Sequence, residues 1–460
     1  MNATRGRGRT AIISVGTRRE RGPRYHSIGI GAGPANLSLA ALFESVAPHQ
    51  IALFEQTRGP AWHPTMLHPG VKMQTSWLKD LVSLVDPQHR LSFMNYLVSS
   101  GRVYAFLSAQ YDSIPRLEFS GYLAWASDQL DHVHRGSRID RVSFDDGFCV
   151  YSGDALLARS DHLVLGLGTR ARMPEAFTGL DERVVLADHL YRHKQHLATD
   201  PESRIAVVGG GQTGAESVLE LLRMGHRDIW WIGRRPWFQI LEDSPSANDL
   251  YRPSYTSFLP SLPDEARRRT VAKQVLTSDG VSDSTLREIY QHNYEAMLQG
   301  ECNPVTLLPG RDVVAARHDG QGLTLTCDEA GGRETYDVRY AVVAAGRQPA
   351  PLPFDDELRE LIDFDDRGEP VVEADYSLRW SGPRGHRIFA QNRAPSMHGL
   401  ADKNLSLLAT RSATIINSLF EREVFTLRDD CVTMLWGKQA PQQQQQPQPV
   451  DLVERIAANG

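Results

Sequence analysis

The chain has 460 residues, of which 41% are hydrophobic and 23% charged, and its formal net charge is −6 at pH 7. These values are typical of a globular protein and exclude a generally basic nucleic-acid-binding protein. No run approaches the ~18 consecutive apolar residues of a membrane-spanning helix. The four cysteines include no CxxC pair, which argues against a cysteine-rich metal site and a disulfide scaffold. We therefore expect a cytoplasmic protein of several domains.

The two ends of the chain differ from its body. Residues 1–24 are irregular and rich in arginine, which predicts a disordered basic tail; a targeting peptide or a contact with an anionic surface are the alternatives. Residues 436–460 include a Gln/Pro-rich run at 441–449 that cannot form an apolar core, and we expect this tail to be disordered as well. The fold should therefore lie within residues 25–435.

The first nucleotide-binding pattern begins at the start of that body. A strand-like run at 26–30 leads into Gly31-Ala-Gly-Pro-Ala-Asn36, followed by apolar residues at helical spacing and by a second strand-like run that ends at Glu55. This order is the dinucleotide-binding pattern. Gly31 would permit the tight turn, Gly33 would admit a pyrophosphate, and Asn36 replaces the third glycine. Because Glu55 would accept ribose hydroxyls, the pattern predicts FAD; a glycine-rich turn without a nucleotide is the alternative.

A second pattern follows a strand-like run at 204–208. It is a complete GxGxxG, and its candidate NADPH-binding residues are Gly209, Gly211, Gln212, Thr213 and Gly214. The next strand-like run, at 228–232, ends in Gly233-Arg-Arg235 and not in an acid. A carboxylate there would repel a 2′-phosphate, whereas Arg234 or Arg235 can bind one. We therefore expect NADPH at this site, with a solvated strand end as the alternative for the two arginines.

Two such patterns in one chain predict an α/β fold with two Rossmann-like dinucleotide-binding domains. The apolar runs at 163–168 and 338–346 are similar, and we interpret both as strands of the FAD domain. We therefore assign residues 25–199 and 336–435 to a discontinuous FAD-binding domain. Residues 200–335 form the inserted NADPH-binding domain, which includes a small, mainly helical substrate region at 240–300. Because no CxxC follows the first pattern, a disulfide reductase is disfavoured.

Several longer segments make the chain similar to the flavin-dependent N-hydroxylating monooxygenases of siderophore biosynthesis, which include L-lysine N6-, L-ornithine N5- and diamine N-monooxygenases. The segments that carry the resemblance are 31–40, 62–63, 73–82, 92–97, 115–125, 243–248 and 398–411. It implies that FAD and NADPH are the cofactors and that O2 is the co-substrate. A C4a-hydroperoxyflavin would then hydroxylate the terminal primary amine of L-lysine or of a diamine such as cadaverine or putrescine, for hydroxamate siderophores.

The resemblance also implies roles for single residues around the flavin. It places Trp62, His63 and Gln74 near the flavin, and it makes Arg116 a secondary candidate for binding NADPH. His63 is the weakest of these assignments, because a packed histidine explains it equally well. No metal-ligand cluster stands out among the 16 histidines, and the implied reaction requires no metal.

At the substrate, the resemblance assigns Lys79, Asn248 and Ser406. Lys79 is a point cation that suits an α-carboxylate, the Asn248 oxygen could orient a neutral amine, and Ser406 would lie close to both flavin and substrate. Two structural alternatives remain open: Lys79 could pair with the neighbouring Asp80, and Asn248 could simply cap a turn.

Some residues depart from the family pattern. Gln212-Thr213-Gly214 stands where Gln-Ser-Ala is frequent, and Ala344-Ala-Gly-Arg347 replaces an Ala-Thr-Gly-Tyr segment. The stretch 276–282 lacks the second substrate asparagine of the ornithine enzymes, which favours the lysine and diamine branch. An L-ornithine N5-hydroxylase, a carbon- or sulfur-oxygenating flavin monooxygenase and a nucleotide sensor without turnover remain the alternatives. A homo-oligomer is compatible with the sequence, but no stoichiometry follows from it.

Overall fold

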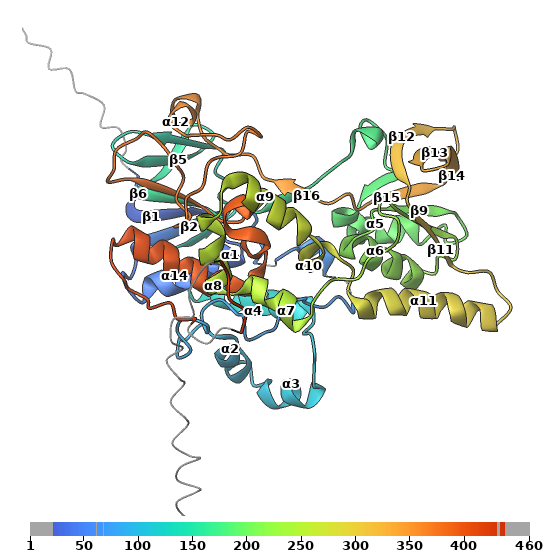
Figure 1. Ribbon diagram of the computed structural model, residues 1–460, viewed down its shortest axis with the longest axis horizontal. Helices are drawn as coiled ribbons and strands as arrows, with labels where there is room; N and C mark the ends of the chain where they lie inside the picture. The colour runs from blue at the N-terminus through green and yellow to red at the C-terminus, as the bar shows by residue number, and fades with distance from the viewer. Residues whose placement is uncertain (1–21, 61, 68, 430–432, 438–460) are drawn as a thin grey trace, which may run out of the picture.

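The computed structural model describes residues 22–60, 62–67, 69–429 and 433–437. Most of each predicted tail, residues 1–21 and 438–460, lies outside the described residues. The described chain forms two α/β lobes that are joined by a narrow ribbon (Figure 1). None of the helices in this part of the chain is long and apolar enough to cross a membrane.

The first lobe is built on a seven-stranded sheet with the strand order β3-β2-β1-β6-β5-β4, and β17 pairs with β6. The strands are β1 (Arg24–Ile30), β2 (Ile51–Glu55), β3 (Val133–Arg135), β4 (Arg141–Phe144), β5 (Phe148–Ser152), β6 (Ala155–Leu165) and β17 (Arg387–Ala390). The pairs of β1 with β2 and of β1 with β6 are parallel, as the dinucleotide pattern predicts.

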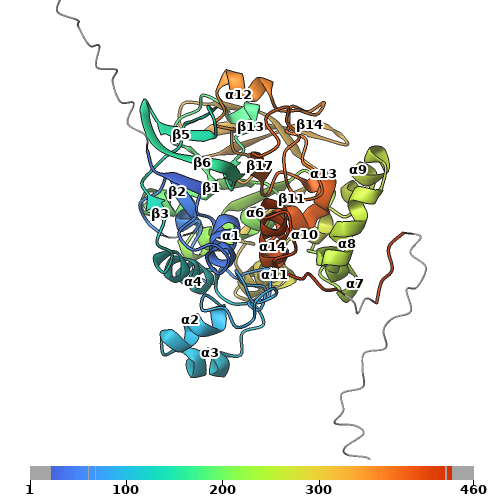
Figure 2. The same cartoon turned by 90° about the vertical axis from the view of Figure 1, so that its left-hand side faces the viewer.

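Two helices far apart in sequence lie side by side in this lobe. They are α1 (Pro34–Glu44) and α14 (Leu408–Leu419), and they belong to one apolar core together with α4 (Arg116–Asp128) (Figure 2). The remaining helices of the lobe are α2 (Phe93–Ser99), α3 (Val103–Ala109), α12 (Asp356–Glu360) and α13 (Pro395–His398), with short 3-10 turns η1 (Pro64–Met66), η6 (Gly399–Lys403) and η7 (Leu405–Leu407). The second half of the FAD domain therefore closes over the first.

The second lobe has a five-stranded parallel sheet with the order β11-β10-β9-β15-β8, and a separate three-stranded antiparallel sheet. The parallel strands are β8 (Val184–Leu186), β9 (Ile205–Val208), β10 (Ile229–Gly233), β11 (Val305–Pro309) and β15 (Tyr340–Val343). The antiparallel strands are β12 (Asp312–His318), β13 (Leu323–Glu329) and β14 (Gly332–Val338). The main helices are α5 (Leu190–Leu197), α6 (Gln212–Arg223) and α11 (Asp283–Leu298).

The sequence-based placement of the run 338–346 in the FAD domain is wrong. β15 lies between β9 and β8, and Val342 pairs with Val207 on one side and with Val185 on the other. By sheet membership the inserted lobe therefore begins before residue 200 and ends after residue 335. The apolar run predicted a buried strand correctly, but apolarity does not reveal which sheet a buried strand joins. The similar run at 163–168 does contribute to the first sheet, through β6.

Two connections join the lobes, and they pair with each other. β7 (Thr169–Ala171) and β16 (Arg347–Pro349) form a two-stranded antiparallel ribbon, with Arg347 opposite Ala171 and Pro349 opposite Thr169. This ribbon lies between the two lobes in Figure 1. The chain thus passes between the lobes in two short paired segments.

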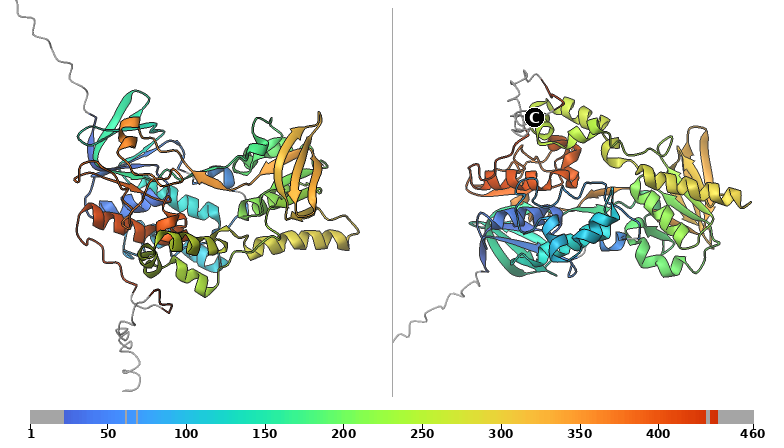
Figure 3. Two further views of the ribbon diagram at one scale, coloured as in Figure 1. Left: turned by 45° about the horizontal axis from the view of Figure 1, so that its top comes forward. Right: turned by 90° about the horizontal axis from the view of Figure 1, so that it is seen from below.

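The predicted helical region consists of α7 (Pro245–Asn248), α8 (Pro253–Phe258), α9 (Asp264–Lys273) and α10 (Leu276–Asp279), with η4 (Asp249–Tyr251) and η5 (Leu259–Ser261). These helices are inserted between β10 and β11 of the second lobe, yet α8 and α9 contact α13 of the first lobe. The ion pair of Arg252 with Asp429 also ties α8 to the C-terminal part of the first lobe. The region, yellow-green in Figure 3, thus bridges the two lobes.

Candidate functional site

A cleft of about 1450 Å3 lies between the lobes. Both glycine loops line it: Gly31 and Gly33 come from the first lobe, and Gly209 and Gly211 from the second. This volume exceeds the ~300–1000 Å3 of an ordinary pocket for one small ligand. The cleft therefore has room for two extended nucleotides.

The first glycine loop has the geometry that FAD requires. Gly31 has a φ of +91°, and a Cβ there would lie 2.4 Å from the Gly166 carbonyl oxygen, so only glycine fits. Gly33 caps α1, and a Cβ there would have no atom within 4 Å, which leaves the helix N-terminus open for a pyrophosphate. Glu55 lines the cleft at the end of β2, where its Oε2 accepts a hydrogen bond from the Ala32 N–H at 2.9 Å. These residues fit FAD.

Asn36 shapes this loop from behind. Its Nδ2 donates to the carbonyl oxygens of Ile30 and Gly31, at 3.1 and 2.8 Å, and its Oδ1 accepts from Gln391 Nε2 at 2.7 Å. The side chain is fully buried and does not line the cleft. The expectation that Asn36 touches the cofactor is therefore corrected, because its amide is used to hold β1, the loop and the strand β17 together.

The second glycine loop is equally constrained. Gly209 has a φ of +136°, and a Cβ there would lie 2.1 Å from the Ala344 carbonyl oxygen. A Cβ on Gly214 would lie 2.0 Å from the Gly209 carbonyl oxygen, which also accepts a hydrogen bond from Trp231 Nε1. Gly214 thus permits close packing of α6, whereas a Cβ on Gly211, which caps α6, would have only the Asp279 carbonyl oxygen near it, at 4.0 Å. The loop fits a second pyrophosphate.

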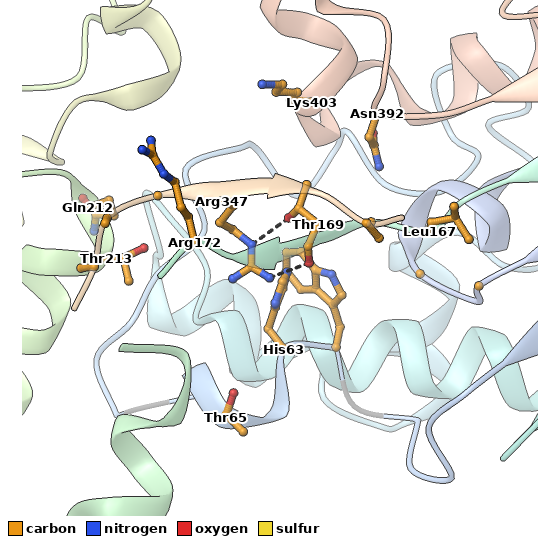
Figure 4. A pocket seen from close by; sticks show the side chains of 18 of the residues that line it. His63, Thr65, Leu167, Thr169, Arg172, Gln212, Thr213, Arg347, Asn392 and Lys403 are labelled. Atoms are coloured by element: carbon orange, nitrogen blue, oxygen red, sulfur yellow. Dashed lines mark hydrogen bonds between the residues drawn. The ribbon is translucent and has the colours of Figure 1, made fainter. Parts of the chain in front are cut away.

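Gln212 and Thr213 both line the cleft beside this loop (Figure 4). The Gln212 side chain is already engaged: its Oε1 accepts from the Ser282 N–H at 2.7 Å, and its Nε2 donates to Glu216 Oε1 at 3.0 Å. Gln212 therefore ties the start of α6 to the start of α11. Its predicted contact with NADPH stays a prediction.

The two arginine candidates differ in their surroundings. Arg234 follows β10, lines the cleft and is exposed, so its charge is available to a 2′-phosphate. Arg116 instead forms a bidentate ion pair with Glu216, at 3.0 and 3.2 Å, in which the side chains are 15% and 6% exposed. Because Glu216 already neutralises its charge, Arg116 serves better as a link between α4 of the first lobe and α6 of the second.

Trp62, His63 and Gln74 all line the cleft, and their predicted place beside the flavin stays a prediction. The rings of Trp62 and His63 pack edge to face with centroids 4.6 Å apart. Burial, together with the charges of Arg347 and Arg116, lowers the pKa of His63 to about 4, so its imidazole is neutral at pH 7. Gln74 Nε2 donates to Ser282 Oγ at 3.2 Å and so reaches the second lobe.

On the substrate side the structure brings Lys79 and Ser406 together. Lys79 Nζ donates to Ser406 Oγ at 3.4 Å, and Ser406 Oγ donates to Asn404 Oδ1 at 2.7 Å. Burial lowers the pKa of Lys79. Lys79 and Ser406 do not line the large cleft themselves, but the neighbours of Ser406, Lys403 and Leu405, do.

Asp80 is not the partner of Lys79, so the alternative of a surface ion pair is wrong. Asp80 is buried, and its carboxylate accepts hydrogen bonds from the N–H groups of Val82, Ser83 and Phe93. These bonds anchor the segment that carries Lys79 onto α2. Lys79 has no carboxylate partner among the described residues.

Asn248 lies apart from these two residues. It ends α7, its side chain is exposed, and its Nδ2 donates to the carbonyl oxygens of Asp243 and Ser244, at 3.0 and 3.2 Å. No hydrogen bond within the described ranges connects it with Lys79 or Ser406. The turn-capping alternative is thus correct for the nitrogen, while Oδ1 receives no hydrogen bond from the described residues.

Asn392 of the cleft and Asp188, which pairs with the cleft residue Arg347, were not singled out from the sequence. Asn392 follows β17, has a φ of +64°, and its Oδ1 accepts from the buried Arg411 at 3.0 Å. Asn tolerates this left-handed conformation better than most residues, but a single asparagine gives no usable signal in the sequence. Asp188 was missed as well, because only the fold brings it to Arg347.

The sequence of the chain is similar to those of known proteins. The family model described as L-lysine 6-monooxygenase/L-ornithine 5-monooxygenase matches residues 24–349. The L-lysine N6-monooxygenase of Escherichia coli is 33% identical over 421 residues, which are 89% of this chain and 97% of that protein.

Solved structures of similar fold include enzymes of the same kind. A cadaverine monooxygenase of the desferrioxamine pathway from Erwinia amylovora, bound to FAD, is 27% identical with a TM-score of 0.84, over 90% of this chain and 99% of that one. An ornithine N-hydroxylase from Kutzneria sp. 744, in complex with reduced FAD, NADP+ and L-ornithine, is 28% identical with a TM-score of 0.80, over 87% and 99%. The two glycine loops, the inter-lobe cleft and these matches together show that the chain belongs to the FAD- and NADPH-dependent N-hydroxylating monooxygenases of lysine, ornithine and diamines in siderophore biosynthesis.

Proposed function

We propose that this enzyme hydroxylates the terminal amine of L-lysine. The observation that carries the proposal is the partly buried ammonium of Lys79, which contacts the Ser406 hydroxyl at 3.4 Å and has no counter-charge among the described residues. Burying a cation without a partner is costly. The α-carboxylate of an amino-acid substrate would supply the missing charge and would restore the pKa of Lys79 toward its ordinary value.

The same cation disfavours diamines. Cadaverine carries an ammonium where L-lysine carries its amino-acid end, and a second cation beside Lys79 would be repelled. The E. coli relative named for lysine also supports this choice. Diamine hydroxylation is the second candidate, because the Erwinia amylovora protein of similar fold is named for cadaverine. The ornithine alternative is disfavoured by the stretch 276–282, which contains no asparagine.

The cofactors would supply the electrons and the activated oxygen, while the chain binds and orients the reactants. The loop at 31–35 and Glu55 would hold FAD, and the loop at 209–213 with Arg234 would hold NADPH. Because both loops open into one cleft, the two nucleotides would meet between the lobes. The bridging helices and the ribbon would limit access of water to that meeting point.

The substrate amine must lose a proton before it reacts, because an unperturbed lysine ammonium has a pKa of about 10.4. A dry pocket lowers that pKa by disfavouring the charge. The Asn248 Oδ1 could accept a hydrogen bond from the neutral amine without stabilising its protonated form in the way a carboxylate would. Lys79 would meanwhile hold the carboxylate at the other end of the substrate.

A substrate panel tests the proposal. Purified holoenzyme is given NADPH, O2 and either L-lysine, L-ornithine, cadaverine or putrescine, and the hydroxylamine product is measured together with NADPH consumption. We expect the highest kcat/KM and the tightest coupling of NADPH to product with L-lysine. Faster hydroxylation of a diamine would refute the role of Lys79, and bound FAD without hydroxylamine from any of the four amines would refute amine hydroxylation altogether.

A further inference from the structure

The side chain of Arg347 reinforces the ribbon between the lobes. Arg347 begins β16, and its Nε donates to Thr169 Oγ1 at 2.7 Å while its Nη2 donates to the Thr169 carbonyl oxygen at 2.8 Å. Both hydrogen bonds cross from β16 to β7, as Figure 4 shows. They add to a backbone ribbon in which each strand has only three residues. Arg347 therefore stiffens the ribbon on the side that faces the cleft.

A third contact of Arg347 ties the ribbon to the second lobe. Arg347 Nη1 forms an ion pair with Asp188, which lies in the turn η3 (Ala187–His189) directly after β8 of the second sheet. The two side chains are 31% and 20% exposed, so water screens the pair only in part. Charge-assisted hydrogen bonds between guanidinium and carboxylate are stronger than neutral ones and fix geometry. The orientation of β8, and of the sheet it belongs to, is thereby coupled to the ribbon.

Arg347 also lies beside the part of the cleft that the first lobe forms. It lines the cleft together with His63, and its charge contributes to the lowered pKa of that imidazole. In Figure 4 the guanidinium lies between His63 and Thr169, with Gln212 and Thr213 toward one end of the view and Leu167 toward the other. The Arg347 side chain therefore contacts the ribbon and the second lobe and lies beside His63 of the first lobe.

We propose that Arg347 and Asp188 are a positioning pair that fixes the NADPH-binding lobe against the FAD-binding lobe for electron transfer. Three of the guanidinium's nitrogens already have partners, so the pair acts by placement and not by binding a phosphate. The pair would act on flavin reduction, whichever amine is hydroxylated.

The test uses Arg347→Gln, Asp188→Ala and the double variant as FAD-bound enzymes. The matched control is Arg192→Gln, because Arg192 is exposed in α5, directly after the turn that carries Asp188, and does not line the cleft. Stopped-flow absorbance measures flavin reduction at saturating NADPH without amine. We expect each single variant to be reduced on the order of tenfold to a hundredfold more slowly, since small misplacements have effects of this size. The double variant should be little slower than the singles, because both break one contact.

Three further measurements separate placement from other roles. The dissociation constant for NADPH and the rate of reduction by dithionite should match those of wild type. Amide hydrogen exchange should be faster in Arg347→Gln, and not in the control, at Arg172 and Ala350, whose N–H groups donate to Gly346 and Gly168 across the ribbon. This readout does not require turnover.

Two results would overturn the proposal. One is wild-type reduction by NADPH in both single variants; the other is a weaker NADPH affinity with an unchanged maximal rate, which would make Arg347 a nucleotide-binding residue. If Arg347→Gln fails to retain FAD, Asp188→Ala decides alone, because it removes only the link to the second lobe. A wild-type reduction rate in that variant refutes the pair.

Discussion

Replacing Lys79 with methionine tests how the enzyme recognises its substrate. Methionine keeps most of the length of the side chain and removes its charge. A hydrogen bond to a charged group contributes about 1.5–3 kcal/mol, and each ~1.4 kcal/mol corresponds to a factor of ten. We therefore expect kcat/KM for L-lysine to fall about tenfold to a hundredfold. Cadaverine has no carboxylate, so its kcat/KM should stay the same or rise.

The assay is hydroxylamine formation from L-lysine and from cadaverine, measured with the same enzyme preparations. Lys72→Met is the matched control, because Lys72 is an exposed lysine of the same segment and does not line the cleft. Flavin reduction by NADPH without amine should be unchanged in both variants. If Lys79→Met loses activity equally toward both amines, the carboxylate argument is wrong.

The pKa of Lys79 adds a pH dependence to this prediction. Because burial lowers that pKa, the cation is lost at a lower pH than in an exposed lysine. Its contribution to binding is present below the pKa and disappears above it. The ratio of KM for L-lysine to KM for cadaverine should therefore rise with pH in wild type. In Lys79→Met this ratio should remain flat, and a parallel rise there would assign the effect to another group.

Three further changes probe other parts of the molecule. Arg234→Ser should raise the KM for NADPH about tenfold or more, because a charge-assisted hydrogen bond is lost, and should leave the KM for NADH unchanged. Steady-state kinetics with both nucleotides measures this. An equal change of KM for NADPH and NADH would show that Arg234 does not bind the 2′-phosphate. Gly209→Ala should lower Tm in calorimetry and abolish reduction by NADPH, since its Cβ would lie 2.1 Å from the Ala344 carbonyl oxygen; normal reduction would show that the loop can rearrange. Burial lowers the pKa of His398 to about 4, from 6.5, so the unfolded chain binds the extra proton between these values and stability falls as pH drops through this window. The free energy of unfolding lost in this way is at most about 3 kcal/mol. Urea unfolding at pH 7.5 and 5 should show a smaller loss of stability in His398→Phe, which keeps a ring stacked on Tyr376. An equal loss in the variant and in wild type would show that another group titrates.

The glycine loops could be predicted from the sequence because their constraints are local. Gly31 and Gly209 are required by positive φ angles and by carbonyl oxygens close to where a Cβ would lie, and the motif spacing reflects this. The sheet that β15 joins could not be predicted, because strand pairing is decided by residues far away in the chain. Asn36 shows a different limit: the motif marks it as important, but the same amide suits a ligand and a buried loop equally well, and only the contacts with Gln391 decide.

The substrate side and the cofactor side of the site are held by different contacts. Each glycine loop is fixed within its own sheet, whereas Lys79 depends on Asp80, Ser406 on Asn404, and the bridging helix α8 on the ion pair of Arg252 with Asp429. The substrate-side anchors come from segments far apart in the chain that meet only after both halves of the first lobe have folded together. Because no residue of either glycine loop belongs to these anchors, a residue on the substrate side can change while the backbone of both loops keeps its own contacts. This separation gives a physical reason why one fold can serve relatives named for lysine, ornithine and cadaverine.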